Sequence, residues 1–132
     1  MVGIKDLGVL LKSMNPKISG KNYVFCTIGE REFESMNLNS LLVFREKEGV
    51  TVVIKEDEAK KNNLDFSDKW DLITLNVHSD LNAVGLLAAV SGELAKHKIS
   101  INVVSAYYHD HIFVHANKSK RALGVLKKIG AV

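Results

Sequence analysis

The sequence predicts an α+β fold in which antiparallel strands and helices follow one another in two similar halves. Three observations lead to this class. Residues 70–77 alternate apolar and polar side chains, which is the period of a half-buried strand. Residues 82–97 repeat apolar side chains every three or four positions, as an amphipathic helix does. Two stretches rich in β-branched and aromatic residues, 101–107 and 111–115, flank a polar turn and predict a hairpin.

The first half is predicted to begin with a helix over residues 4–14, where apolar residues recur at helical spacing. Pro16 ends this helix, because proline disfavours helix in the residue before it, and the chain then turns at residues 18–21. A strand at 23–28 follows, and then an acidic surface loop with one helical turn at 29–39. Strands at 41–45 and 50–55 are joined by a hairpin loop that ends in Gly49. A short charged helix at 56–63 comes last.

Two helices complete the second half. One flank of the helix at 82–97 consists almost entirely of small residues, so a second helix is expected to pack closely beside it. After the hairpin, the last helix carries apolar residues on one face and cationic residues on the other. Its apolar face consists of Ala122, Val125, Leu126 and Ile129.

Composition and charge exclude several classes of protein. The single cysteine, Cys26, excludes a disulfide framework, and its apolar strand favours a buried, inert thiol. No stretch has the length of a signal-peptide core or a membrane span. The net charge of +3 reflects the basic last helix, which lacks interleaved aromatic residues and therefore favours a solvated face over a nucleic-acid site. We expect a soluble, cytoplasmic protein with no nucleic-acid or membrane partner.

Two motifs in the second half carry a family resemblance. The turn His78-Ser79-Asp80-Leu81-Asn82 runs into Ala83-Val84-Gly85-Leu86-Leu87, which is similar to an Asp-x-x-Gly-Leu-Leu pattern, although Asp80 lies five residues before Gly85 instead of three. Ile99-Ser100-Ile101-Asn102 is similar to a Gly-Ile-x-Ile motif, with Lys98 in place of the glycine. In these motifs the chain resembles the ACT domain, a small ferredoxin-like module that binds amino acids and regulates metabolic enzymes.

The longer strings AVGLLAAVSGELA, INVVSAYYHDHIFV, YVFCT and FREKEG resemble a narrower group within this family. That group comprises short bacterial and archaeal proteins with two ACT-like halves, related to the ACT pairs of cytosolic arginine sensors. The resemblance implies a tandem of ferredoxin-like sandwiches, each with an antiparallel sheet and helices on one face.

The halves are assigned to residues 1–66 and 67–132, and they are expected to pack together because no flexible linker separates them. Compared with the β-α-β-β-α-β order of a complete unit, the first half lacks an opening strand and the second a closing one. Unpaired strand edges are usually covered, so the halves, or two chains, are expected to complete each other. A fragment of residues 67–132 is therefore expected to be insoluble or to self-associate.

The first candidate site is the turn before the helix at 82–97. A helix start offers unpaired backbone N–H groups and a positive dipole end, which suit a carboxylate. From the residues alone, the polar side chains can equally cap the helix and bind nothing. In the ACT family this turn faces a neighbouring domain's strands, and the ligand lies between them. The resemblance therefore implies binding by Ser79, Asp80, Leu81, Asn82, Ala83, Val84 and Gly85. On this hypothesis Gly85→Val keeps the fold and loses the ligand.

The second group of candidates lies on the predicted hairpin. Asn102 and Ser105 interrupt an apolar strand, and a buried amide needs partners, either backbone groups or a bound amino acid. His109, Asp110 and His111 carry the His-x-His spacing of some metal sites, so a zinc or iron site is one alternative. The resemblance instead implies that His109 and Asp110 contact the ammonium or carboxylate group of a ligand.

The leading hypothesis is a regulatory protein that senses an amino acid at an interface between ACT-like units, as a homodimer or higher homo-oligomer without a cofactor. The sequence contains no catalytic motif of the common enzyme classes, so we predict that the protein is not an enzyme. Two alternatives stay open. One is an oligomeric interaction module without a ligand, and the other is a metal-dependent enzyme built on the histidines.

Overall fold

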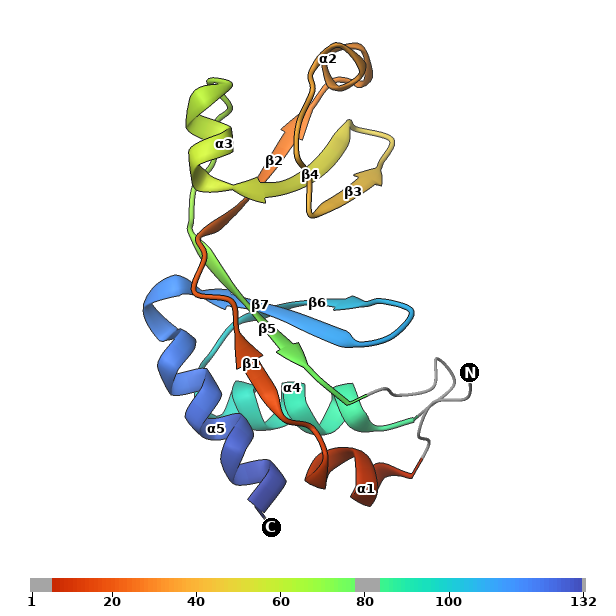
Figure 1. Ribbon diagram of the computed structural model, residues 1–132, viewed down its shortest axis with the longest axis vertical. Helices are drawn as coiled ribbons and strands as arrows, with labels where there is room; N and C mark the ends of the chain where they lie inside the picture. The colour runs from red at the N-terminus through yellow and green to blue at the C-terminus, as the bar shows by residue number, and fades with distance from the viewer. Residues whose placement is uncertain (1–5, 78–83, 132) are drawn as a thin grey trace. The chain divides into compact units, whose positions relative to one another are not determined.

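The computed structural model describes residues 6–77 and 84–131, and the chain forms two units (Figure 1). The terminal unit comprises residues 1–20 and 71–132 and so contains both chain ends. The central unit comprises residues 21–70. Each unit has a hydrophobic core of its own.

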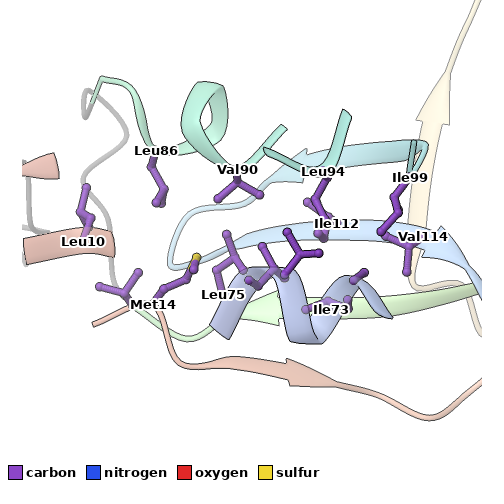
Figure 2. Packing of buried hydrophobic residues seen from close by; sticks show 14 residues of the cluster. Leu10, Met14, Ile73, Leu75, Leu86, Val90, Leu94, Ile99, Ile112 and Val114 are labelled. Carbon is purple, nitrogen blue, oxygen red and sulfur yellow. The ribbon is translucent and has the colours of Figure 1, made fainter. Parts of the chain in front are cut away.

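In the terminal unit, helices cover one face of a sheet. Its elements in chain order are α1 (Leu7–Lys12), β1 (Pro16–Ile18), β5 (Trp70–Leu75, whose first residue belongs to the central unit), α4 (Leu86–Lys96), β6 (Ile101–Ser105), β7 (Asp110–His115), a 3-10 turn (Ala116–Lys118) and α5 (Ser119–Ala131). The strands lie in the order β1-β5-β7-β6. Leu10 of α1 and Leu94 of α4 pack with Ile73 and Ile112 of the strands in one buried cluster (Figure 2). The sandwich predicted for this part of the chain is therefore present.

Strand β1 departs most from the sequence prediction. The sequence predicts a turn at residues 18–21, whereas Pro16–Ile18 pairs antiparallel with Ile73–Leu75 of β5. Proline can occupy the first position of an edge strand, because no ladder partner requires its missing N–H group. This strand supplies the closing strand that residues 67–132 lack, so the strand sharing expected from the sequence occurs within one chain.

A buried carboxylate fixes the turn that follows β1. Asp71 is only 6% exposed, and its Oδ1 accepts hydrogen bonds from Ser19 Oγ at 2.8 Å and from the Gly20 N–H at 3.1 Å. Gly20 has φ +70°, a left-handed conformation that glycine adopts without steric cost. Burial of the charged group is tolerated because donors from the chain replace water around it.

The ends of the terminal unit's helices follow local chemistry. The Asp6 side chain caps α1 by accepting a hydrogen bond from the Val9 N–H at 3.0 Å. This helix lies inside the predicted range 4–14, of which residues 4 and 5 are outside the described residues. It ends before Asn15, which has φ +40°. Helix α4 ends before Lys98, which has φ +57°, and Ile99 N–H donates back to Leu94 O at 3.0 Å.

The central unit is a second, smaller α/β unit. Its elements are β2 (Tyr23–Ile28), α2 (Glu30–Ser35), β3 (Leu42–Arg45), β4 (Val50–Lys55) and α3 (Glu56–Lys61). The strands form an antiparallel sheet in the order β3-β4-β2, and Trp70 pairs with Tyr23. The predicted strands, hairpin and charged helix are confirmed, whereas α2 is a helix where a mostly irregular loop is predicted. Burial raises the pKa of the Cys26 thiol, and the negative charge of Asp65 raises it further, so the thiol stays protonated.

Candidate functional site

The described part of the predicted ligand site lies entirely in the terminal unit. Ser79, Asp80, Leu81, Asn82 and Ala83 lie outside the described residues. The other predicted residues are Val84 and Gly85 before α4, Asn102 and Ser105 on β6, His109 in the hairpin turn and Asp110 at the start of β7.

Gly85 adopts a left-handed conformation immediately before α4, with φ 98° and ψ −17°. The helix begins at Leu86, so the prediction that residues 84 and 85 are helical is wrong, because this conformation cannot continue a right-handed helix. A Cβ atom at position 85 would lie 3.2 Å from Cδ2 of Leu7. Gly85→Val is therefore expected to destabilise the terminal unit, since valine would bring both backbone strain and a steric conflict.

The start of α4 is a source of hydrogen-bond donors. Gly85 has no side chain with which to cap the helix, and the first N–H groups of any α-helix have no partner inside it. The helix dipole also places partial positive charge at this end. Val84, which precedes Gly85, is 82% exposed. This arrangement suits a carboxylate or another small anion.

Ser105 and Asp110 lie opposite each other across the hairpin of β6 and β7. Asp110 is only 8% exposed, and it alternates along β7 with Ile112 and Val114 of the helix-side core, so its side chain lies on the face that α4 covers. In both views the hairpin turn lies toward the end of the unit at which α4 begins (Figures 1 and 2). A carboxylate in this position suits an ammonium group.

Asn102 does not join this group. It lies three positions from Ser105 on one strand, so the two side chains lie on opposite faces of the sheet. Both residues are exposed, because β6 is the last strand in the order. The premise that they are a pair of buried polar groups is therefore wrong.

His111 forms a hydrogen bond on the face opposite the helices. Its Nδ1 lies 2.9 Å from Oγ1 of Thr74 on β5, and the rings of His109 and His111 are 6.2 Å apart. Burial lowers the pKa of His111, and positive charge on His109 lowers it further. The negative charge of Asp110 raises this pKa, but by less. Within residues 6–77 and 84–131, no group of three or more His, Cys, Asp or Glu side chains is arranged to hold a metal ion.

Thr74 and Asp71 form hydrogen bonds that the sequence did not predict. The alternation of residues 70–77 places Thr74 on the polar face, which was the available signal. Its partner is visible only once β5 is known to neighbour β7. Asp71 gave no signal, because its partners Ser19 and Gly20 lie about fifty positions away. The turn that contains them was predicted, but the strand β1 that brings it beside β5 was not.

Family models match both parts of the chain. Residues 2–70 match one model of the ACT domain, and residues 68–128 match a second. The chain belongs to the ACT domain family and has the tandem ferredoxin-like fold of paired ACT domains. ACT domains are typical of regulatory proteins.

Solved structures share this fold along most of the chain. A Vibrio cholerae protein of unknown function, described as a possible transport protein, is 44% identical, with 97% of this chain and 98% of that chain covered and a TM-score of 0.85. Clostridium acetobutylicum aspartate kinase is 10% identical over 86% of this chain and 34% of that chain, with a TM-score of 0.68. A candidate C-terminal regulatory domain of aspartate kinase from Porphyromonas gingivalis is 16% identical over 87% of this chain and 96% of that chain, with a TM-score of 0.56.

The two aspartate kinase comparisons show a shared fold alone, because their identity to this chain is low. No curated protein matches the chain. Within the described residues, no helix combines the length and apolar character that a membrane span requires.

Proposed function

We propose that this protein is a cytoplasmic regulatory protein that binds an amino acid between the start of α4 and the hairpin of β6 and β7. One observation carries the proposal. The buried carboxylate of Asp110 and the donor-rich start of α4 both belong to the helix side of the terminal unit, at the same end. An α-amino acid presents the complementary pair, an ammonium group for Asp110 and a carboxylate for the helix start.

Ser105 extends this site toward the edge of the sheet. Its hydroxyl can donate or accept a hydrogen bond, and its exposure leaves it accessible to a ligand that also contacts Asp110. The resemblance to the ACT pairs of arginine sensors makes cationic amino acids the first ligands to test. The residues 79–83 that precede the helix complete the proposed site.

A second copy of the chain is the proposed partner. Strand β6 ends the strand order of the terminal unit, and Val103 in its middle is 41% exposed. An apolar strand edge of this kind is usually covered by another chain or element. A homodimer formed along β6 would place the ligand close to the contact between copies, so binding could change the association.

A thermal-shift screen with the twenty amino acids tests the proposal. A ligand that binds only the native state at a hundredfold excess over its Kd adds about 2.7 kcal/mol to the free energy of unfolding, which is a shift of several degrees. Asp110→Asn and Ser105→Ala should reduce this shift, whereas Asp57→Asn, on an exposed residue of α3, should not.

Two outcomes would contradict the proposal. If no amino acid shifts the melting temperature while the protein still forms dimers, an interaction module without a ligand is the better account. If Asp57→Asn reduces the shift as much as Ser105→Ala does, the ligand binds elsewhere. Ser105→Ala is the more informative variant, because Asp110 is buried and its substitution also affects stability.

A further inference from the structure

A hollow on the helix side of the terminal unit has no role in the proposed amino-acid site. It lies between α1, α4 and α5 and has a volume of about 370 Å³. That volume falls in the range of small-molecule pockets. Its lining residues are Leu11 of α1, Glu93 of α4, His97 directly after α4, and Val125, Lys128 and Ile129 of α5.

The floor of the hollow is aliphatic. Val125 is buried, and Leu11 and Ile129 are half-buried beside it. Helices α1, α4 and α5 come together at this place, as Figure 1 shows, so the floor is built from more than one element. An aliphatic group of a few carbons would remove these side chains from water, which favours its binding.

One wall of the hollow supplies hydrogen-bond acceptors. The Glu93 side chain is 37% exposed and carries a carboxylate. Nδ1 of His97 lies 3.0 Å from the backbone carbonyl oxygen of Glu93, and a carbonyl can only accept, so the hydrogen must be on Nδ1. In the neutral ring, Nε2 is then an acceptor. Both residues belong to the C-terminal end of α4, where the helix dipole is negative, so this wall suits an ammonium group.

The opposite wall supplies a cation. Lys128 lies in the last turn of α5, is exposed and has no salt-bridge partner among the described residues. Its ammonium group can donate to a carboxylate. The formal charges of Glu93 and Lys128, which both line the hollow, cancel each other. A free carboxylic acid would be repelled by Glu93 and a free amine by Lys128, whereas a molecule with both groups satisfies each wall.

We propose that this hollow is a second binding site, and that its ligand is a zwitterion with an aliphatic side chain, such as a branched-chain α-amino acid. The inference does not rest on the proposed function, because the two sites lie at opposite ends of α4. The helix has 11 residues and is therefore about 16 Å long, so one small ligand cannot occupy both.

Titration of the isotope-labelled full chain with L-leucine tests the inference by amide NMR. We expect chemical-shift changes at Glu93, His97 and Lys128. Three probes each lack one feature: leucinol lacks the carboxylate, 4-methylpentanoate lacks the ammonium group, and glycine lacks the side chain. Each should bind at least about tenfold more weakly than leucine, since each leaves one wall or the floor without its partner.

Matched variants separate the site from its surroundings. Glu93→Gln and Lys128→Met should each weaken leucine binding about tenfold. Lys120→Met removes a charge from the same helix outside the hollow, and Lys96→Met removes the 3.4 Å ion pair with Glu93 but leaves the carboxylate. Neither of these controls should weaken binding.

Three results would overturn the inference. The first is that leucine causes no shift at Glu93, His97 or Lys128. The second is that leucinol and 4-methylpentanoate bind as well as leucine, and the third is that Lys120→Met weakens binding as much as Lys128→Met. Leucine-induced shifts confined to Gly85, Ser105 and Asp110 would likewise contradict the second site while leaving the proposed function intact.

Discussion

The hydroxyl of Thr74 on β5 lies 2.9 Å from Nδ1 of His111 on β7. This hydrogen bond joins two neighbouring strands of the terminal unit on the face away from the helices. Because burial and the neighbouring His109 lower the pKa of His111, the native protein favours the neutral ring.

We therefore expect His111 to make stability depend on pH. As the pH falls below about 6.5, the unfolded chain takes up a proton at His111 before the native chain does, so the free energy of unfolding decreases. Below the native pKa of His111 both states are protonated, and this residue lowers the stability no further. The melting temperature should drop less in His111→Gln than in the wild type between about pH 7.5 and about pH 5.5. An NMR titration that places the His111 pKa at or above its ordinary value would contradict this prediction.

Two glycines at α4 should respond to alanine in opposite directions. Gly85→Ala should lower the free energy of unfolding by about 1–2 kcal/mol, because its φ of 98° is strained for any residue with a Cβ atom. Gly92 lies inside the helix and has open space around a Cβ, so Gly92→Ala should raise stability by about 0.5–1 kcal/mol. Urea unfolding of both variants measures this. Equal effects of the same sign would contradict the assigned helix start.

Removal of the buried carboxylate of Asp71 should lower the free energy of unfolding more than removal of an exposed carboxylate. Asp71→Ala leaves the Ser19 hydroxyl and the Gly20 N–H without their acceptor, which should cost about 1–3 kcal/mol. Asp57→Ala removes an exposed carboxylate from α3 and should change stability by less than about 0.5 kcal/mol. Chemical denaturation compares the two, and similar losses in both variants would show that Asp71 does not fix the turn after β1.

Residues 67–132 without β1 should not form a stable monomer. The fragment lacks the strand that pairs with Ile73–Leu75 and also lacks Leu10 and Met14 of the core. A synthetic peptide of residues 6–20 should restore a soluble one-to-one complex, which sedimentation velocity can detect. A fragment that is monomeric and natively folded by itself would contradict the role of β1.

The sequence predicted those elements whose composition is distinctive and whose ends carry turn residues. Residues 23–28 and 50–55 are rich in β-branched and aromatic side chains, and both are strands with the predicted bounds. The three-residue strand β1 is too short for a period to be recognised, and its existence depends on pairing with β5 about fifty-five positions away.

The site was only partly predictable for a related reason. Ser105 was predicted as a polar residue in an apolar strand and Asp110 from the family resemblance, and the structure places them opposite each other. The left-handed conformation of Gly85 depends on how the chain enters α4 and packs near Leu7, which no local pattern reveals. The hollow beside Glu93 and Lys128 is formed by helices from both ends of the chain, and so it could not be found from spacing.

The most direct test of the proposed function is to map the bound amino acid by amide NMR on the labelled full chain. The best ligand from the thermal-shift screen should change the signals of Gly85, Leu86, Ser105 and Asp110 more than those of the central unit, and Ser105→Ala should weaken that binding. If none of the twenty amino acids changes these signals at millimolar concentration, the protein does not sense an amino acid at this site.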